Sequence, residues 1–183
     1  MNILLTGFEP FGGNLFNPSC AIAEQLGGEV LPVSASRLRA AFEAAVAEFR
    51  PAVVVALGLA ENRTEICIER VGINVLDFRI PDNDGEQPRG VPIDPAGPDA
   101  YLSDLPVREI EAVWLANGIP GAVSNTAGTF CCNQILYLAR RMGLRAGFIH
   151  LPPPEVVPME VQLSAVRLAM DVAVGPQSGD QSS

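Results

Sequence analysis

The stretch AVSNTAGTFCCNQILYLARRMGLRAGFIH, residues 122–150, contains two short apolar runs and, between them, a helical pattern. In that pattern apolar side chains recur at helical spacing, at Ile135, Leu138 and Met142. Gly143 follows where a helix-ending glycine belongs, because a left-handed backbone costs glycine little. A strand, a helix and a second strand in this order are typical of α/β folds with parallel strands.

The same alternation extends over the remainder of the chain. Short apolar or β-branched runs predict five strands, at residues 3–6, 30–33, 53–57, 122–124 and 146–149. Helical spacing predicts four helices, around residues 38–49, 107–114, 135–142 and 159–172. With 183 residues, of which 48% are apolar, the chain can bury one substantial core. We therefore predict an α/β fold, a single-domain α/β/α sandwich over residues 1–174 with a twisted, mostly parallel mixed sheet.

Three segments depart from this alternation. Residues 64–80 predict two strands that are joined near Gly72, as a hairpin inserted after the third strand. Prolines and turn residues are too dense in residues 81–100 for a helix or a central strand, so a long loop is expected there. The last residues, 175–183, lack apolar side chains and are predicted to be a disordered tail.

The acidic composition limits the partners that we expect. The formal net charge is -9, with 12 Lys and Arg against 21 Asp and Glu. Nucleic acids and anionic lipid surfaces bind to basic faces, which this composition rarely provides. No apolar run approaches the roughly 18 residues of a membrane span. We therefore expect neither nucleic acid nor membrane as a partner.

The cysteines and the first residues indicate a cytoplasmic protein. The opening segment NILLTG has no basic region or cleavage site of a signal peptide. The four cysteines, Cys20, Cys67, Cys131 and Cys132, show no CxxC spacing, and reduced thiols fit them better than disulfides. With one histidine and scattered cysteines, the sequence supports no zinc site, and GFEPFGG lacks the GxGxxG spacing of a dinucleotide-binding turn.

His150 is the most informative single residue. It is the only histidine, and it ends the predicted strand AGFIH just before a proline run. Ligands and catalytic groups of open α/β sheets gather at the carboxyl ends of strands. A lone histidine is more often structural than catalytic, so it is the position of His150 that favours a role in proton transfer.

Cys132 occupies the predicted first turn of a helix, with Thr129 as a candidate N-cap. The helix dipole and the free N–H groups there stabilise a thiolate, so we expect a lowered pKa for this thiol. The same N–H groups can bind the oxyanion of a tetrahedral intermediate. The alternative is that the cysteine pair packs beneath the helix as small apolar residues. A third group must orient the imidazole, and 21 acidic residues leave that choice open.

Five motifs in order resemble those of the pyroglutamyl-peptidase I family, also called pyrrolidone-carboxylate peptidases. They are TGFEPFGG with the following Asn17 and Pro18, then IERVGIN, FRIPDN, TAGTFCCN and GFIHLP. Together they lie within residues 5–152. The resemblance implies a cysteine omega-peptidase that hydrolyses the amide bond after an N-terminal pyroglutamyl residue of peptides, needs no cofactor and assembles as a homotetramer.

The resemblance also assigns roles to residues of this sequence. It implies Cys132 as nucleophile, His150 as acid and base, Glu69 as the residue that orients the imidazole, and Arg79 as an aid to the oxyanion. It also implies that the pyroglutamyl pocket is lined by Phe8, Phe11 and Phe130, with Asn17 as a polar contact and the backbone near Leu59 as a further one. A flat neutral lactam suits aromatic walls, and a charged N-terminus would be costly to desolvate there. For the phenylalanines the alternative is ordinary core packing.

Two other functions stay open. One is a nucleoside-phosphorylase-like enzyme, because that enzyme class resembles the expected fold and a fold does not determine function. It needs a phosphate site, for which the chain shows no basic cluster with a glycine-rich turn. The other is an inactive module that binds pyroglutamyl peptides, against which the intact Glu69, Cys132 and His150 argue.

Overall fold

The computed structural model describes residues 2–175, and the predicted tail beyond Gly175 lies outside them. At its centre is a six-stranded sheet in the order β2-β1-β3-β8-β4-β7. The strands are β1 (Ile3–Phe8), β2 (Glu29–Leu31), β3 (Val53–Leu59), β4 (Ile66–Glu69), β7 (Gly121–Ser124) and β8 (Ala146–Leu151). All neighbouring pairs are parallel except β4 with β8, which is antiparallel. The sheet is therefore mixed and mostly parallel, as predicted.

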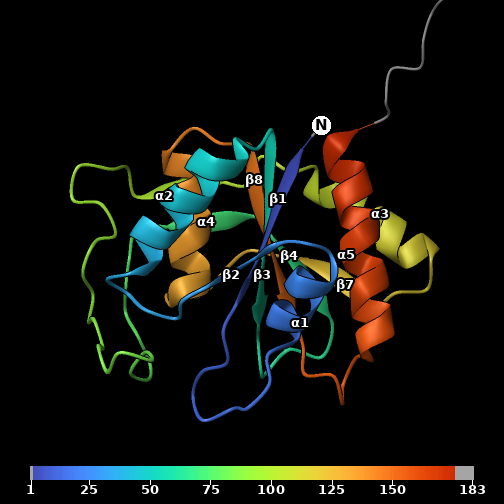
Figure 1. The fold of residues 1–183 in the computed structure, drawn as a ribbon. Coiled ribbons are helices and arrows are strands. Elements are labelled where there is room, and N and C mark those ends of the chain that lie inside the picture. The colour runs from blue at the N-terminus through green and yellow to red at the C-terminus, as the bar shows by residue number, and fades with distance from the viewer. Residues whose placement is uncertain (1, 176–183) are drawn as a thin grey trace, which may run out of the picture.

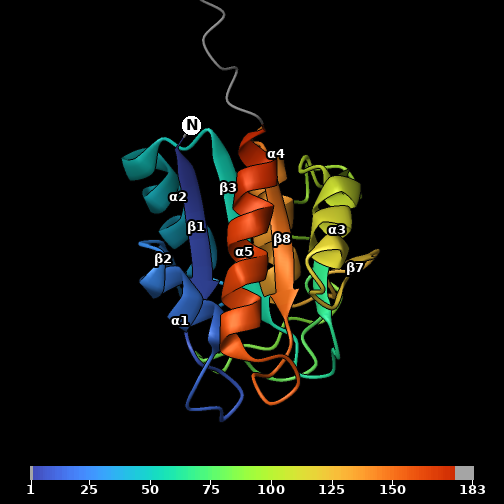
Figure 2. The same ribbon diagram turned by 90° about the vertical axis from the view of Figure 1, so that its right-hand side faces the viewer.

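Helices cover both faces of this sheet, which confirms the predicted α/β/α layers (Figure 1). The helices are α1 (Pro18–Gln25), α2 (Leu38–Phe49), α3 (Val107–Ala116), α4 (Cys131–Arg141) and α5 (Met159–Val174). One core cluster joins α2 and α4 to the sheet, and a second joins α1, α3 and α5 to the opposite face. Figure 2 shows α5 lying along the sheet in front of β8. Every residue of β3 and β8 is buried, as expected of central strands with both faces covered.

The predicted hairpin over residues 64–80 is wrong. β4 enters the main sheet between β8 and β7, and all four of its residues are buried. The next strand, β5 (Val71–Ile73), leaves that sheet and pairs with β6 (Ala100–Leu102). The side chain of Asn133 on α4 holds β5 there, accepting from the Ile73 N–H at 2.8 Å and donating to the Ile73 carbonyl at 2.8 Å. Burial of β4 in the main sheet and the contact of β5 with the Asn133 amide thus outweigh the pairing of these two strands with each other around Gly72.

The sequence analysis also missed α1. Asn17 is the N-cap of α1, its side-chain oxygen accepts from the Ser19 N–H at 3.0 Å, and Pro18 occupies the first turn. Asparagine followed by proline is a known helix-start signal, but the short apolar pattern of residues 18–25 hides it. This helix follows directly from the loop that continues β1.

The long loop over residues 81–99 is confirmed, and Ala100 already belongs to β6. Asp82 organises the beginning of this loop. Its carboxylate accepts from the N–H groups of Ala35, Asp84 and Glu86 at 2.7, 3.0 and 2.9 Å. The part of the chain that the structure describes contains no helix long and apolar enough to cross a membrane.

Candidate active site

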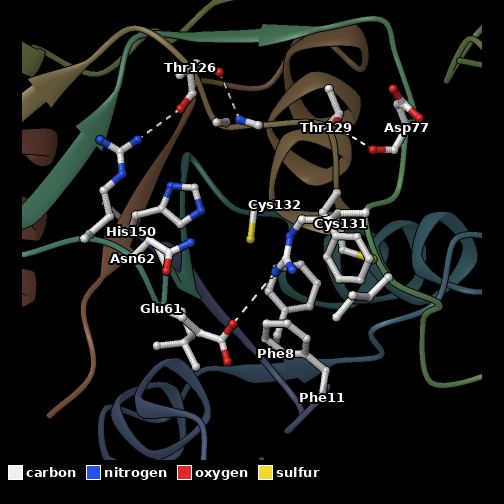
Figure 3. Close-up of a pocket in the computed structure, with 18 residues that line it drawn as sticks. Phe8, Phe11, Glu61, Asn62, Asp77, Thr126, Thr129, Cys131, Cys132 and His150 are labelled. Atoms are coloured by element: carbon white, nitrogen blue, oxygen red, sulfur yellow. Dashed lines mark hydrogen bonds and ion pairs between the residues drawn. The ribbon is translucent and has the colours of Figure 1, made fainter. Parts of the chain in front are cut away.

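A pocket of about 470 Å³ opens where three strands end and α4 begins (Figure 3). Phe8 is the last residue of β1 and Leu59 the last of β3, while His150 is the last but one of β8. Cys131 and Cys132 contribute the first turn of α4. The remaining lining residues are Phe11, Ala60, Glu61, Asn62, Arg63, Asp77, Arg79, Ile80, Thr126, Ala127, Gly128, Thr129 and Phe130. The pocket thus occupies the edge of the sheet that the sequence predicted for a ligand.

His150 is held from behind by a buried carboxylate. Its Nδ1 lies 2.7 Å from Oε1 of Glu69, whose side chain is 0% exposed. The antiparallel register explains the contact, because β4 sets Cys67 opposite His150 and Glu69 opposite Phe148. Glu69 is therefore a diagonal neighbour on the same face of the sheet. With Nδ1–H donating to the carboxylate, Nε2 is the nitrogen left to exchange protons with a ligand in the pocket.

Cys132 is the second residue of α4, where backbone N–H groups have no partner within the helix. Figure 3 shows its sulfur and the His150 ring facing one another across the pocket. Gly58 of β3, the register partner of His150, lies directly against that sulfur, since a Cβ added there would meet Sγ at 2.7 Å. The thiol, the free N–H groups and the imidazole thus converge on one point, which is an arrangement for covalent acyl transfer.

The expected N-cap at Thr129 is wrong. Phe130 occupies the N-cap position and makes no side-chain cap. The Thr129 hydroxyl instead donates to the carbonyl of Asp77 at 2.7 Å, and the Asp77 N–H donates to the Thr129 carbonyl at 3.1 Å. These bonds tie the loop before α4 to the segment that carries Arg79. A side-chain cap would have occupied N–H groups that here stay available to a ligand.

The expected lowering of the Cys132 pKa is also wrong for the free protein. Burial, and after it the negative charge of Glu69, raises the pKa of this thiol to about 12. Desolvation therefore outweighs the helix dipole, and the nucleophile rests as a neutral thiol at neutral pH. Its activation requires that the proton pass to His150 as the sulfur attacks.

Cys131 is the more deeply buried of the two cysteines. It is 1% exposed and belongs to the core cluster under α4, together with Ile135 and Leu138. Burial raises its pKa well above the ordinary range. The sulfur of Cys132 in contrast faces the pocket, although that residue too is only 9% exposed.

Aromatic rings form one wall of the pocket. Phe8, Phe11 and Phe130 all line it, as the resemblance implied, and so does Leu59. The Phe11 and Phe130 ring centroids lie 5.7 Å apart. Phe78, which the sequence analysis did not single out, packs behind Phe130 at 4.2 Å and is fully buried. Phe78 lies in the FRIPDN motif, and that position could have indicated it as a residue of the site.

The structure does not bring Asn17 to the pocket lining. Its amide is engaged at the start of α1, where Nδ2 donates to the Glu9 carbonyl at 3.2 Å and Oδ1 accepts from the backbone and hydroxyl of Ser19. Asn17 therefore shapes the loop that carries Phe11.

Arg79 does line the pocket, but its side chain is 75% exposed and lies 4.0 Å from Glu61.

Arg63 is the main functional candidate that the sequence analysis missed. It lies in the turn after β3, lines the pocket and reaches Oε1 of Glu69 at 3.3 Å. The same guanidinium nitrogen donates to the Ser124 hydroxyl at 2.9 Å. A charged residue in the short turn that follows a buried strand, at the edge where His150 was expected, could have indicated it.

Three comparisons with known proteins agree. The chain matches the family model described as pyroglutamyl peptidase over residues 1–176. A pyrrolidone-carboxylate peptidase from Gloeobacter violaceus is 46% identical over 167 residues, covering 83% of this chain and 82% of the relative. One from Chromobacterium violaceum is 43% identical over 193 residues, covering 94% and 92%. A solved mutant pyrrolidone carboxyl peptidase from Pyrococcus furiosus has a TM-score of 0.91 at 37% identity, covering 95% and 98%.

Proposed function

This chain belongs to the pyroglutamyl peptidase family and is a cysteine peptidase, and on that premise we propose that Cys132, His150 and Glu69 carry its reaction. The reaction is hydrolysis of the amide bond that follows an N-terminal pyroglutamyl residue of a peptide. The observation that carries the proposal is the 2.7 Å contact between Glu69 and His150, behind an imidazole that faces the Cys132 sulfur. That is the geometry of a nucleophile, a base and an orienting group.

In the first half of the reaction, Cys132 attacks the carbonyl carbon of the pyroglutamyl residue. The thiol proton passes to Nε2 of His150 as the sulfur–carbon bond forms and the carbonyl becomes an oxyanion. Free N–H groups of the first turn of α4, with Arg79 at the pocket mouth, stabilise this charge. The imidazolium then gives its proton to the leaving amine, and the carbon–nitrogen bond breaks. A thioester remains on Cys132.

In the second half, water replaces the amine. His150 takes a proton from the water as the water oxygen attacks the thioester carbonyl, and a second tetrahedral intermediate forms. Collapse breaks the sulfur–carbon bond, releases pyroglutamate and returns the proton to the Cys132 sulfur. Glu69 stabilises the imidazolium in both halves and holds Nδ1, so Nε2 keeps its direction.

The pocket walls account for the choice of substrate. Pyroglutamate is a flat lactam without the positive charge of a free N-terminus, so Phe8, Phe11, Phe130 and Leu59 can enclose it without burying an unpaired ion. A free α-amine would lose its hydration against these apolar side chains. The same apolar surface therefore binds the pyroglutamyl ring and excludes a charged N-terminus.

The proposal extends to assembly and location. A homotetramer is proposed on the resemblance to the family, and the exposed apolar side chains Leu15 and Phe16, in the loop that carries Phe11, support a contact between subunits. A cytoplasmic location is supported by the four cysteines, all of which are free thiols.

The test is release of a chromophore from pyroglutamyl amides. The wild-type protein should cleave the pyroglutamyl substrate and leave the matched prolyl and glutamyl amides intact, and alkylation of thiols should abolish the activity. Cys132→Ala should be inactive, with Cys131→Ala as its matched control. No release by the folded wild-type protein, or an active Cys132→Ala variant, would refute the proposal. Phosphate-dependent cleavage of a nucleoside would instead indicate the phosphorylase-like alternative.

A further inference from the structure

Arg63 contacts the same carboxylate of Glu69 that holds His150. Its Nη2 donates to Oε1 of Glu69 at 3.3 Å and to the Ser124 hydroxyl at 2.9 Å. It also donates to the Thr126 carbonyl at 3.3 Å, and Nη1 reaches the Cys67 sulfur at 3.5 Å. The guanidinium is thus fixed by neighbours on β4, at the end of β7 and in the segment that follows β7.

Glu69 needs a positive charge that is present before the reaction begins. Its side chain is 0% exposed, and a buried carboxylate is costly without a paired cation. His150 cannot supply that charge while it is neutral, which is the form that accepts the thiol proton. Within residues 2–175, Arg63 is the one arginine whose guanidinium lies within 4.0 Å of the Glu69 carboxylate.

The two contacts meet at the same atom. Oε1 accepts from both Arg63 and His150, whereas Oε2 has no hydrogen-bond partner within the described residues. Arg63 therefore decides which carboxylate oxygen faces the imidazole and keeps the carboxyl group from rotating. Its 33% exposed side chain also places this charge at the wall of the pocket, so part of the guanidinium stays solvated.

We propose that Arg63 is a positioning residue for the hydrolysis, acting through Glu69: its guanidinium compensates the buried carboxylate and fixes Oε1 where it accepts the Nδ1–H of His150. The inference rests on the proposed function, because it needs Glu69 to orient the imidazole. It differs from a structural role in one measurable respect, which is that the charge of Arg63 acts on the protonation of the dyad.

The sign of this effect follows from the groups that face Glu69 and His150. Arg63 contacts Glu69, the Cys67 thiol lies opposite His150 on β4, and the Cys132 thiol faces His150 from α4. Burial raises the pKa of both thiols, so of the three only Arg63 carries a charge at neutral pH. Glu61, Asp77 and Arg79 also line the pocket, and they are the same in the wild type and in an Arg63 variant. A positive charge opposes protonation of both the carboxylate and the imidazole. Loss of Arg63 therefore makes each proton easier to add, and either proton disables the base. The acid limb of activity should move to higher pH.

The experiment compares Arg63→Gln, which removes the charge, with Arg63→Lys, which keeps it. For pyroglutamyl amide hydrolysis, Arg63→Gln should lower kcat about 10- to 100-fold, because a misplaced imidazole transfers protons poorly, with KM within about 2-fold. The acid limb of kcat/KM should move up by about one pH unit or more. Arg63→Lys should recover part of kcat and keep the wild-type acid limb. Arg108→Gln is the control, since it removes an equal charge from a surface pair on α3.

Two results would overturn the inference. One is a folded Arg63→Gln enzyme with wild-type kcat and acid limb, and the other is a defect confined to KM, which would make Arg63 a substrate contact. If Arg63→Gln does not fold, Arg63→Lys decides: activity with the wild-type acid limb supports the charge role, and inactivity of the folded variant refutes it. An inactive wild-type enzyme would refute the proposed function itself, so the two failures are distinguishable.

Discussion

Replacing Gly58 by alanine measures how closely the end of β3 fits the nucleophile. A Cβ at this position would lie 2.7 Å from Sγ of Cys132 and 2.7 Å from Cζ of Phe148. Ordinary contacts of this kind are roughly 3.5–4.0 Å long, so the sulfur must move by about 1 Å. Such a displacement of a reacting atom costs about 100-fold in rate. The backbone of Gly58 has no positive φ, so the effect comes from the added methyl group alone.

The stability cost of Gly58→Ala should be modest. Overpacking in a core costs typically 1–3 kcal/mol, and each kcal/mol lowers the Tm of a domain of this size by about 2–4 °C. Gly121→Ala is the matched control, because its Cβ would meet the Trp114 ring at 2.5 Å on the opposite face of the sheet. Both variants should melt earlier, and only Gly58→Ala should lose about 100-fold in kcat/KM. Equal activity of the two variants would show that the sulfur has room to move and that this part of the site is wrongly described.

Three further predictions concern the site itself. Glu69→Gln should retain a low measurable rate and Cys132→Ala none above background, because a lost orienter misplaces the base whereas a lost nucleophile ends covalent catalysis; full activity of Glu69→Gln would remove Glu69 from the site. Phe11→Ala and Phe130→Ala should each raise KM by an amount equivalent to about 1–3 kcal/mol, and an unchanged KM with early melting would make these rings core residues. Iodoacetamide should inactivate the enzyme by labelling Cys132, whereas the Cys131→Val variant should keep a turnover within a few-fold of the wild type. The inactivation rate should increase as pH rises, because burial holds the Cys132 thiol protonated at neutral pH. Mass mapping of the labelled peptide checks this last prediction, and a rate that does not change between pH 6 and 9 would contradict it.

Periodicity predicted the layers of the fold because the strongly patterned segments obey local rules. β1 and β8 are apolar runs, and α2 occupies the predicted residues 38–49. β4 was misassigned for a physical reason: a buried strand between two others is not distinguished by its own sequence from one arm of a hairpin. Its partners lie about 80 residues along the chain, in β8, and about 55 residues along, in β7.

The site divides in the same way. His150 and Cys132 were indicated by their positions at a strand end and a helix start, which are local features. Glu69 came only from the resemblance, because its contact with His150 spans 81 residues. The protonation of Cys132 was predicted with the wrong sign, since burial depends on neighbours such as Gly58 and Phe148 that helical spacing does not reveal.

Two requirements on the pocket conflict, because it must exclude charged substrates and must also let Cys132 lose its proton. The apolar walls that suit a neutral lactam also raise the pKa of the Cys132 thiol, so the pocket that selects the substrate weakens the resting nucleophile. A permanent cation beside the sulfur would restore the thiolate but would also disfavour the imidazolium that must form. The structure instead pairs Arg63 with Glu69, so that Arg63 compensates the carboxylate and the carboxylate in turn stabilises His150 once it has taken the proton. Charge then develops at the sulfur only while a carbonyl group is present to receive it.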